Sequence, residues 1–208
     1  MRSRLIAFGC SHTRGQGLSD VPDPKFVGPD FDATVKSKFA WPQLLSNKLN
    51  IECINCGVSG ASNKLITSLV SDFNFKIGDI CIILWSYNPR WTLFFNESTN
   101  ISIIPGKDKP LTKSYYKHLY NEYDHKVMNT IMFRYVNLHL EKLGIKTYNF
   151  SVDHEQCPDD IKDFVLKIPS IRKDLVPLYT SFNGTHLNEE GQQVLTNYML
   201  EYIEEYNE

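Results

Sequence analysis

The residues best suited to chemistry are a serine and a histidine that lie far apart in the chain. Ser11 follows the apolar run Leu5–Phe8 and Gly9, so it belongs to a turn at the end of an expected buried strand. His186 stands just ahead of an expected helix that opens at Asn188. A serine hydroxyl is a weak nucleophile at neutral pH, and histidine, with an ordinary pKa near ~6.5, is the usual base that accepts its proton. The pair predicts nucleophilic attack by Ser11.

Attack on an acyl carbon creates an oxyanion, which needs two or three fixed hydrogen-bond donors. Candidate donors follow two further expected strands. Gly60 lies in a glycine-bearing turn, and Asn88 directly precedes Pro89. The backbone N–H groups of Ser11 and Gly60, with the Asn88 side-chain amide, would supply three donors. Each of these residues is ordinary in a turn, so the hypothesis depends on their joint placement at separate strand ends.

The elements that must position these residues alternate between strands and helices. Apolar runs and turn residues predict strands over 5–8, 51–55, 80–85 and 145–150, helices opening at 42 and 62, a helix over 115–143 broken near Asp124, short and final helices over 159–166 and 188–206, and a hairpin near 101–104. The second half of the long helix carries an apolar stripe formed by Met128, Ile131, Met132, Tyr135, Leu138, His139 and Lys142. This alternation predicts one α/β domain over residues 1–208, a three-layer α/β/α sandwich whose mostly parallel sheet brings the strand ends to one edge.

Composition excludes several classes of partner and site. The 208 residues carry a net charge of −2, which gives no reason to expect nucleic acid or an anionic membrane as a partner. The apolar stretch after Met1 is shorter than a signal peptide's core of roughly seven to fifteen residues, and no run approaches the roughly eighteen residues of a membrane span, so we expect a cytoplasmic protein. Five cysteines, with Cys53 and Cys56 as a lone C-x-x-C, favour free thiols over a disulfide framework or a zinc site.

In their order along the chain, these motifs resemble the SGNH (GDSL-like) hydrolase family. Phe8–Gly15 resembles its first block, with Cys10 in place of the usual aspartate, and Asn55–Gly60 resembles the second. Ser86–Pro89 is similar to the third block more loosely, and Asn183–Asn188 resembles the last. The resemblance spans residues 5 to 200.

The resemblance implies a flavodoxin-like, five-stranded sheet of order 2-1-3-4-5. It implies Ser11 as nucleophile and oxyanion donor, Gly60 and Asn88 as the other donors, and His186 as general base and then general acid. The implied activity is hydrolysis of carboxylic esters with small or carbohydrate-linked acyl groups, through an acyl-enzyme and without cofactor or metal. The implied partner is a small-molecule or carbohydrate ester. The oligomeric state is left open.

Asn183 stands where the family has an aspartate that orients the histidine. In a serine–histidine–aspartate triad, replacing that aspartate with asparagine costs about 10⁴ in turnover. Three alternatives stay open: a Ser11–His186 dyad, an acid supplied by Asp174 or Asp153, or a binding or structural protein with little hydrolysis. Acyl transfer to a sugar is a further alternative, because only the acceptor differs.

Three residues near these motifs are candidate substrate contacts. His12 follows the nucleophile, and Arg90 and Trp91 follow Asn88 closely. Arg90 would bind a carboxylate or a sugar hydroxyl, and Trp91 would stack on a sugar ring; an arginine in a surface ion pair and a packed tryptophan are the alternatives. The adjacent acids and histidine at 153–155 are set aside as a metal site, because three neighbouring loop residues seldom converge on one ion.

Overall fold

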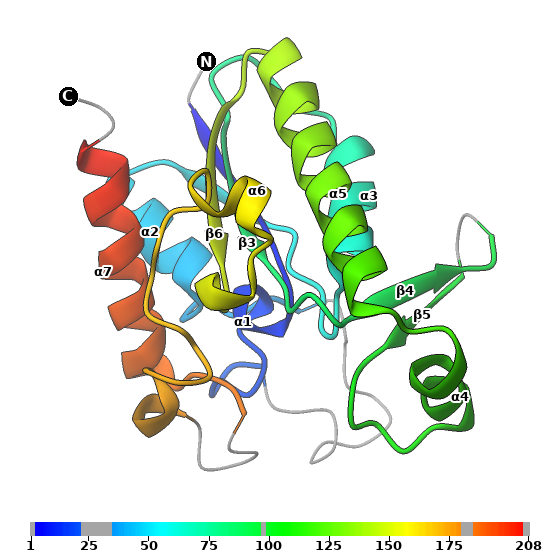
Figure 1. The fold of residues 1–208 in the computed structure, drawn as a ribbon. Coiled ribbons are helices and arrows are strands. Elements are labelled where there is room, and N and C mark those ends of the chain that lie inside the picture. The colour runs from blue at the N-terminus through cyan, green and yellow to red at the C-terminus, as the bar shows by residue number, and fades with distance from the viewer. Residues whose placement is uncertain (1–2, 22–34, 97–98, 180–184, 206–208) are drawn as a thin grey trace.

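The computed structural model describes residues 3–21, 35–96, 99–179 and 185–205. Its centre is a parallel sheet of order β2-β1-β3-β6 (Figure 1). The strands are β1 (Arg4–Phe8), β2 (Glu52–Asn55), β3 (Ile80–Trp85) and β6 (Lys146–Ser151). In the register, Ile6 is opposite both Ile54 and Cys81. The predicted α/β class and parallel sheet are confirmed.

The helices cover the sheet on both faces, which completes the three layers (Figure 1). Helices α2 (Trp41–Leu49) and α7 (Glu189–Glu205) pack together on one face, and α3 (Asn63–Ser71) and α5 (Glu122–Lys142) pack on the other. Side chains of β1 and β3 are almost wholly buried between these layers, as the continuous apolar run of β3 predicts.

The sheet has four strands in the described part of the chain, where five were expected. At the position of the fifth strand, Leu166 forms a single parallel bridge with Phe150, and its N–H donates to Asn149 O at 2.7 Å. Pro169 follows closely and has no N–H to donate, which limits further pairing. The expected order of the remaining strands agrees with the structure.

The long helix expected over 115–143 is two helices, α4 (Pro110–His118) and α5. The break precedes Asp124, because the Asn121 side chain caps α5 by accepting from Asp124 N at 3.0 Å. The expected apolar stripe is correct at Met132, which is buried, and wrong at Ile131, Tyr135 and Leu138, which are about half exposed. The buried face is polar in the first half of α5 and apolar in the second half, with buried residues His125, Asn129, Thr130, Met132, Phe133, Val136 and Leu140.

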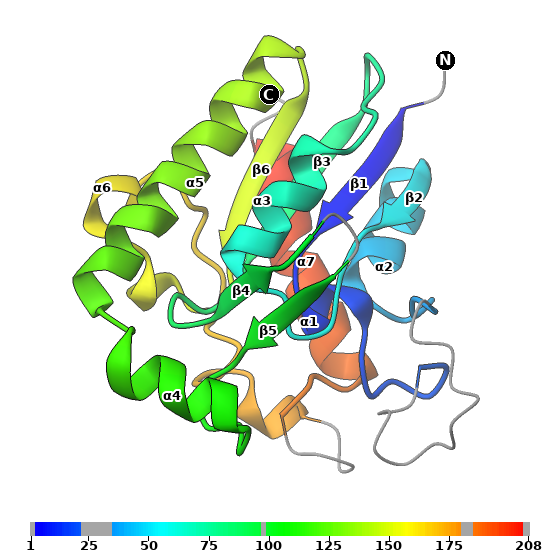
Figure 2. The same ribbon diagram turned by 90° about the vertical axis from the view of Figure 1, so that its right-hand side faces the viewer.

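The remaining elements lie mainly beyond the carboxyl ends of the strands. They are α1 (Ser11–Arg14), the antiparallel hairpin of β4 (Trp91–Phe94) and β5 (Asn100–Ile103), α6 (Asp159–Lys162), and the 3₁₀ turns η2 (His154–Gln156) and η3 (Val176–Leu178). The hairpin and α4 stand to one side of the sheet, next to the edge that carries α1 (Figure 2).

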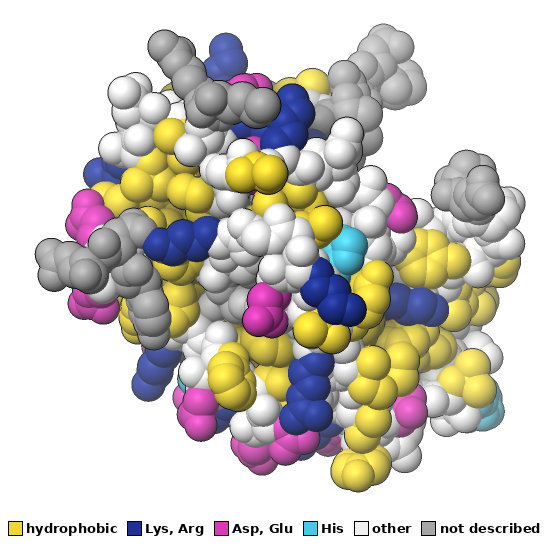
Figure 3. Space-filling view, turned by 90° about the horizontal axis from the view of Figure 1, so that it is seen from above, with side chains coloured by type: hydrophobic (Ala, Val, Ile, Leu, Met, Phe, Trp, Pro, Cys, Tyr) yellow, Lys and Arg dark blue, Asp and Glu magenta, His cyan; other side chains and the backbone are white. Residues whose placement is uncertain are grey.

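The surface near the amino ends of the strands shows no gathering of one charge. Acidic and basic side chains are scattered there among hydrophobic and uncharged ones (Figure 3). All five cysteines are free thiols. Within the described residues, no helix combines the length and the apolar character that crossing a bilayer requires.

Candidate active site

Ser11 is the first residue of the one-turn helix α1, which directly follows β1. The N–H groups of Thr13 and Arg14 both donate to Cys10 O at 3.1 Å, so the chain turns immediately after the strand. A Cβ at Gly9 would lie 2.1 Å from Thr13 Oγ1, which explains the glycine before the turn. The Ser11 side chain is buried, and its hydroxyl makes no hydrogen bond to a described residue.

Helix α1 is held by the loop that follows β2. Asn55 Nδ2 donates to Thr13 O at 2.8 Å, and Val58 N donates to Gly9 O at 3.0 Å. At Gly57, an added Cβ would lie only 2.5 Å from Arg14 N, so the two backbones touch at a position that only glycine allows. This close approach fixes the loop that carries Gly60 against the turn that carries Ser11.

Two further contacts hold α1 from the side chains. Arg14 Nη1 donates to Ser59 Oγ at 3.0 Å, next to Gly60. Gln192 of α7 donates through Nε2 to His12 O at 3.2 Å and accepts from Trp41 N at 3.0 Å. The sequence reasoning missed Gln192, because its role depends on how α7 packs against α2.

Gly60 has a backbone φ of +76°, a conformation that glycine adopts without strain. Its N–H donates to no described residue, and neither does the N–H of Ser11. Two of the three predicted oxyanion donors are therefore uncommitted within the described part of the chain.

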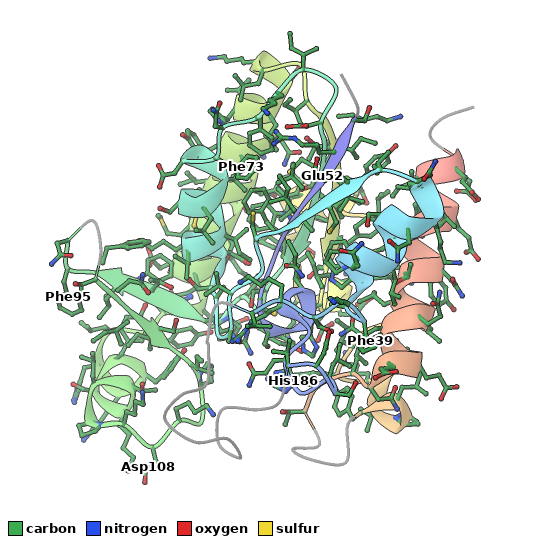
Figure 4. The ribbon with its side chains drawn as sticks, turned by 180° about the vertical axis from the view of Figure 1, so that it is seen from behind. Phe39, Glu52, Phe73, Phe95, Asp108 and His186 are labelled. Atoms are coloured by element: carbon green, nitrogen blue, oxygen red, sulfur yellow. The ribbon has the colours of Figure 1, made fainter. Side chains whose placement is uncertain are left out.

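His186 lies at the carboxyl-end edge of the sheet, close to α1 (Figure 4). Its ring centroid is 5.2 Å from that of His12, the residue after Ser11. Thr185 Oγ1 and His186 Nδ1 are 3.2 Å apart, within hydrogen-bond distance. The structure thus brings the predicted base next to the helix of the predicted nucleophile.

Three residues were candidates for orienting the His186 imidazole: Asn183, Asp153 and Asp174. Asn183 lies outside the described residues. Of the alternative acids, Asp153 Oδ2 accepts from Gln156 Nε2 at 2.9 Å and Asp174 Oδ2 accepts from Ser170 N at 2.7 Å. Neither carboxylate forms a hydrogen bond to His186, so the substitute acid suggested by the sequence is not found at these two positions.

His12 is a buried, neutral imidazole. Burial lowers its pKa well below the usual value, and the nearby His186, Arg90 and Arg172 lower that pKa further. Its Nδ1 is buried without a hydrogen-bond partner in the described part of the chain. His12 therefore faces His186 as an uncharged neighbour.

Asn88 is held by a buried polar network on α5. His125 Nδ1 lies 3.1 Å from Asn88 O, and Tyr115 OH lies 2.9 Å from His125 Nε2. Asn129 Nδ2 is 3.5 Å from the same Asn88 oxygen. The Asn88 side chain itself donates to Gln156 O, which leaves its second amide N–H without a partner among the described residues.

The same network continues to the end of β3. Asn129 Oδ1 accepts from Asn63 Nδ2 at 2.7 Å, and Asn63 Oδ1 accepts from Ser86 N at 2.7 Å. Sequence reasoning missed His125 and Asn129. Their spacing of four residues, which places both on one helix face, was the available signal.

The side chains of Arg90 and Trp91 contact different parts of the molecule. The Arg90 guanidinium stacks on Tyr87, with its carbon 4.7 Å from the ring centroid, and Nη1 donates to Ser86 Oγ at 3.1 Å. The Trp91 ring lies 4.9 Å from the His125 ring, and Lys64 Nζ lies 4.9 Å from the Trp91 centroid. Trp91 thus lies between side chains of α5 and α3, and its role in substrate binding stays a prediction. No group of three or more potential metal ligands comes together in the described residues.

Comparisons with known proteins reveal similarity at the level of fold. No family model matches the chain, and no curated protein matches it. A lipolytic-family G-D-S-L protein from Desulfitobacterium hafniense matches with a TM-score of 0.53 at 14% identity, over 94% of this chain and 97% of that one.

Two esterases match similarly. One is Axe2, an acetylxylan esterase from Geobacillus stearothermophilus, with a TM-score of 0.52 at 14% identity over 95% of this chain and 92% of that one. The other is the psychrotrophic esterase EstA from a Pseudoalteromonas species, with a TM-score of 0.51 at 11% identity over 99% of this chain and 98% of that one. The chain therefore has the fold of SGNH (GDSL-like) hydrolases over nearly its whole length, as its motifs predicted.

Proposed function

We propose that this chain is a serine-dependent esterase that hydrolyses carboxylic esters of small or carbohydrate-linked acyl groups through an acyl-enzyme. The observation that carries the proposal is a set of uncommitted groups at one sheet edge: the Ser11 hydroxyl, the N–H groups of Ser11 and Gly60, and one amide N–H of Asn88. The fold shared with a G-D-S-L protein and two esterases supports it.

In the proposed reaction, Ser11 Oγ attacks the ester carbonyl carbon while His186 accepts the hydroxyl proton. The carbonyl oxygen becomes an oxyanion that accepts hydrogen bonds from Ser11, Gly60 and Asn88. The intermediate then collapses, the C–O bond to the alcohol breaks, and His186 returns the proton to the departing alkoxide. Water, activated by the same histidine, attacks the acyl-enzyme and releases the acid and free Ser11.

We propose that Ser11 and His186 act as the nucleophile and base of this reaction. Thr185 Oγ1, at 3.2 Å from His186 Nδ1, is the orienting contact in view. Since the Ser11 hydroxyl has no hydrogen bond to His186 here, the two side chains must approach when substrate binds, as catalytic pairs often do.

The test uses a fluorophosphonate probe and a chromogenic short-chain ester. We expect the probe to label Ser11, identified by mass spectrometry, and Ser11→Ala to lower kcat/KM for 4-nitrophenyl acetate by at least about 10³-fold. Ser114→Ala, an exposed serine of α4, is the matched control and should retain full activity. A folded protein whose Ser11 resists the probe and that cleaves no ester would be a binding protein on this fold.

A further inference from the structure

A cleft opens at the turn that carries Asn88, lined by neighbours of Asn88 and not by Asn88 itself. Its volume is about 240 Å³, and Tyr87, Pro89 and Arg90, which flank Asn88 in the sequence, line it. Gln156, whose carbonyl accepts the Asn88 amide hydrogen bond, lines it as well. The cleft is therefore adjacent to a proposed oxyanion donor and has room for a group of a few heavy atoms.

Two guanidinium groups converge on one ring in this cleft. The guanidinium carbon of Arg172 lies 4.0 Å from the centroid of the Tyr87 ring, and that of Arg90 lies 4.7 Å from it. Stacking on an aromatic face fixes a guanidinium plane while its N–H groups remain directed outward from its edges. Arg172 comes from the loop before η3, so the pair forms only in the folded protein.

No negative charge balances these two cations in the described part of the chain. Neither arginine forms an ion pair there, and no aspartate or glutamate lines the cleft. Arg90 Nη1 donates to Ser86 Oγ, while its Nε is buried without a partner. Like charges held this close without a counter-ion favour an anionic ligand.

The Tyr116 hydroxyl, on one wall of the cleft, is already hydrogen-bonded to backbone. Tyr116 OH donates to Pro89 O at 2.7 Å and lies 3.3 Å from Ile103 O, so this wall of the cleft is fixed by backbone contacts. The charges of both arginines also lower the pKa of His12, which shows that their electrostatic field extends to the residue beside Ser11.

We propose that Arg90 and Arg172 form an anion subsite, and that the ester cleaved at Ser11 carries a carboxylate or a phosphate group. This inference rests on the proposed esterase function and names the substrate class of that site. Guanidinium groups bind both anions through paired N–H donors, so the two share one recognition chemistry.

The kinetic test compares esters that differ only in charge. The carboxylate pair is 4-acetoxybenzoate against its methyl ester, and the phosphate arm is 4-acetoxyphenyl phosphate against its dimethyl ester. We expect a KM about tenfold lower for the charged member of at least one pair, and we expect Arg172→Gln to remove that preference. Arg134→Gln, an exposed arginine of α5 outside the cleft, is the control and should keep it. Equal KM values within both pairs would overturn the subsite while leaving the esterase proposal intact.

A binding test separates the two proposals. Ser11→Ala is titrated calorimetrically with sodium benzoate and with inorganic phosphate, and we expect saturable binding of at least one anion that Arg172→Gln abolishes and Arg134→Gln does not. Such binding, together with failure of the unchanged protein to cleave any of these esters, would support the anion subsite and overturn the esterase. Absence of binding by either anion, or binding that persists in Arg172→Gln, would overturn the subsite.

Discussion

The turn that carries Ser11 and the turn that carries Asn88 end neighbouring strands, but different kinds of contact hold them. The Ser11 turn is fixed mainly by backbone: Gly57 lies directly against Arg14, and Val58 N donates to Gly9 O. The Asn88 turn is fixed by side chains of α5, because His125 and Asn129 both approach its carbonyl oxygen. The predicted nucleophile thus depends on a steric fit between two loops, and the predicted oxyanion donor depends on a buried polar network.

Gly57→Ala breaks the steric fit and has the largest expected effect on stability. Its Cβ would lie 2.5 Å from Arg14 N and 2.8 Å from Thr13 C, both backbone atoms that cannot rotate away. We expect the free energy of unfolding, measured in urea, to fall by about 3 kcal/mol.

Gly106→Ala is the control for this substitution. Gly106 has a φ of +78° and no atom within 4 Å of an added Cβ, so it reports the left-handed backbone cost alone, about 1 kcal/mol. Equal losses in the two variants would mean that the loops can separate freely, which would contradict the steric account of the Ser11 turn.

Asn129→Ala breaks the network behind Asn88. It removes the acceptor of Asn63 Nδ2 and a donor near Asn88 O, and the side chains of Asn129 and Asn63 are both buried. We expect a loss of about 2 kcal/mol in the free energy of unfolding, because buried polar groups lose partners. Asn197→Ala, an exposed asparagine of α7, should change it by less than about 0.5 kcal/mol. Similar small effects in both variants would show that the network does not stabilise this turn.

His12→Gln tests how the Ser11 turn, unlike the Asn88 turn, makes the stability of the protein depend on pH. Both ring nitrogens of His125 have partners, whereas His12 Nδ1 has none and the pKa of His12 is well below the usual value. Below about pH 6.5 the unfolded chain binds a proton at residue 12 that the folded chain does not. Its contribution to stability therefore falls as the pH drops, by about 1.4 kcal/mol per pH unit.

Urea unfolding at pH 7, 6 and 5 measures this effect. We expect the stability of His12→Gln to fall less steeply with decreasing pH than that of the unchanged protein, with the difference confined to the range below about pH 6.5. Parallel pH curves for the two proteins would show that folding does not lower the pKa of His12.

Much of the scaffold could be predicted from local sequence. Apolar runs and turn residues identified the four sheet strands of the described part of the chain, and a helix was correctly expected to open at residue 62, where the Ser62 hydroxyl accepts from Leu65 N. The buried face of α5 was predicted only in part. Of the predicted stripe, Met132 is buried, whereas Ile131, Tyr135 and Leu138 are about half exposed. The first turns of the buried face carry the polar residues His125 and Asn129, which a search for apolar spacing passes over.

The candidate site divides in the same way. Its motif residues, Ser11, Gly60, Asn88 and His186, are recognisable because strand ends and turns have short-range signatures that neighbouring residues determine. Their neighbours in space are side chains distant in sequence. Gln192 donates to the backbone oxygen of His12, and His125 lies within hydrogen-bond distance of Asn88 O. Arg172 and Arg90 both stack on the Tyr87 ring. The chain's own sequence determined the class of fold and the residues placed at the sheet edge. Only the tertiary structure decided their contacts and local charge, because packing between distant helices and loops sets which polar groups meet and which remain without a partner.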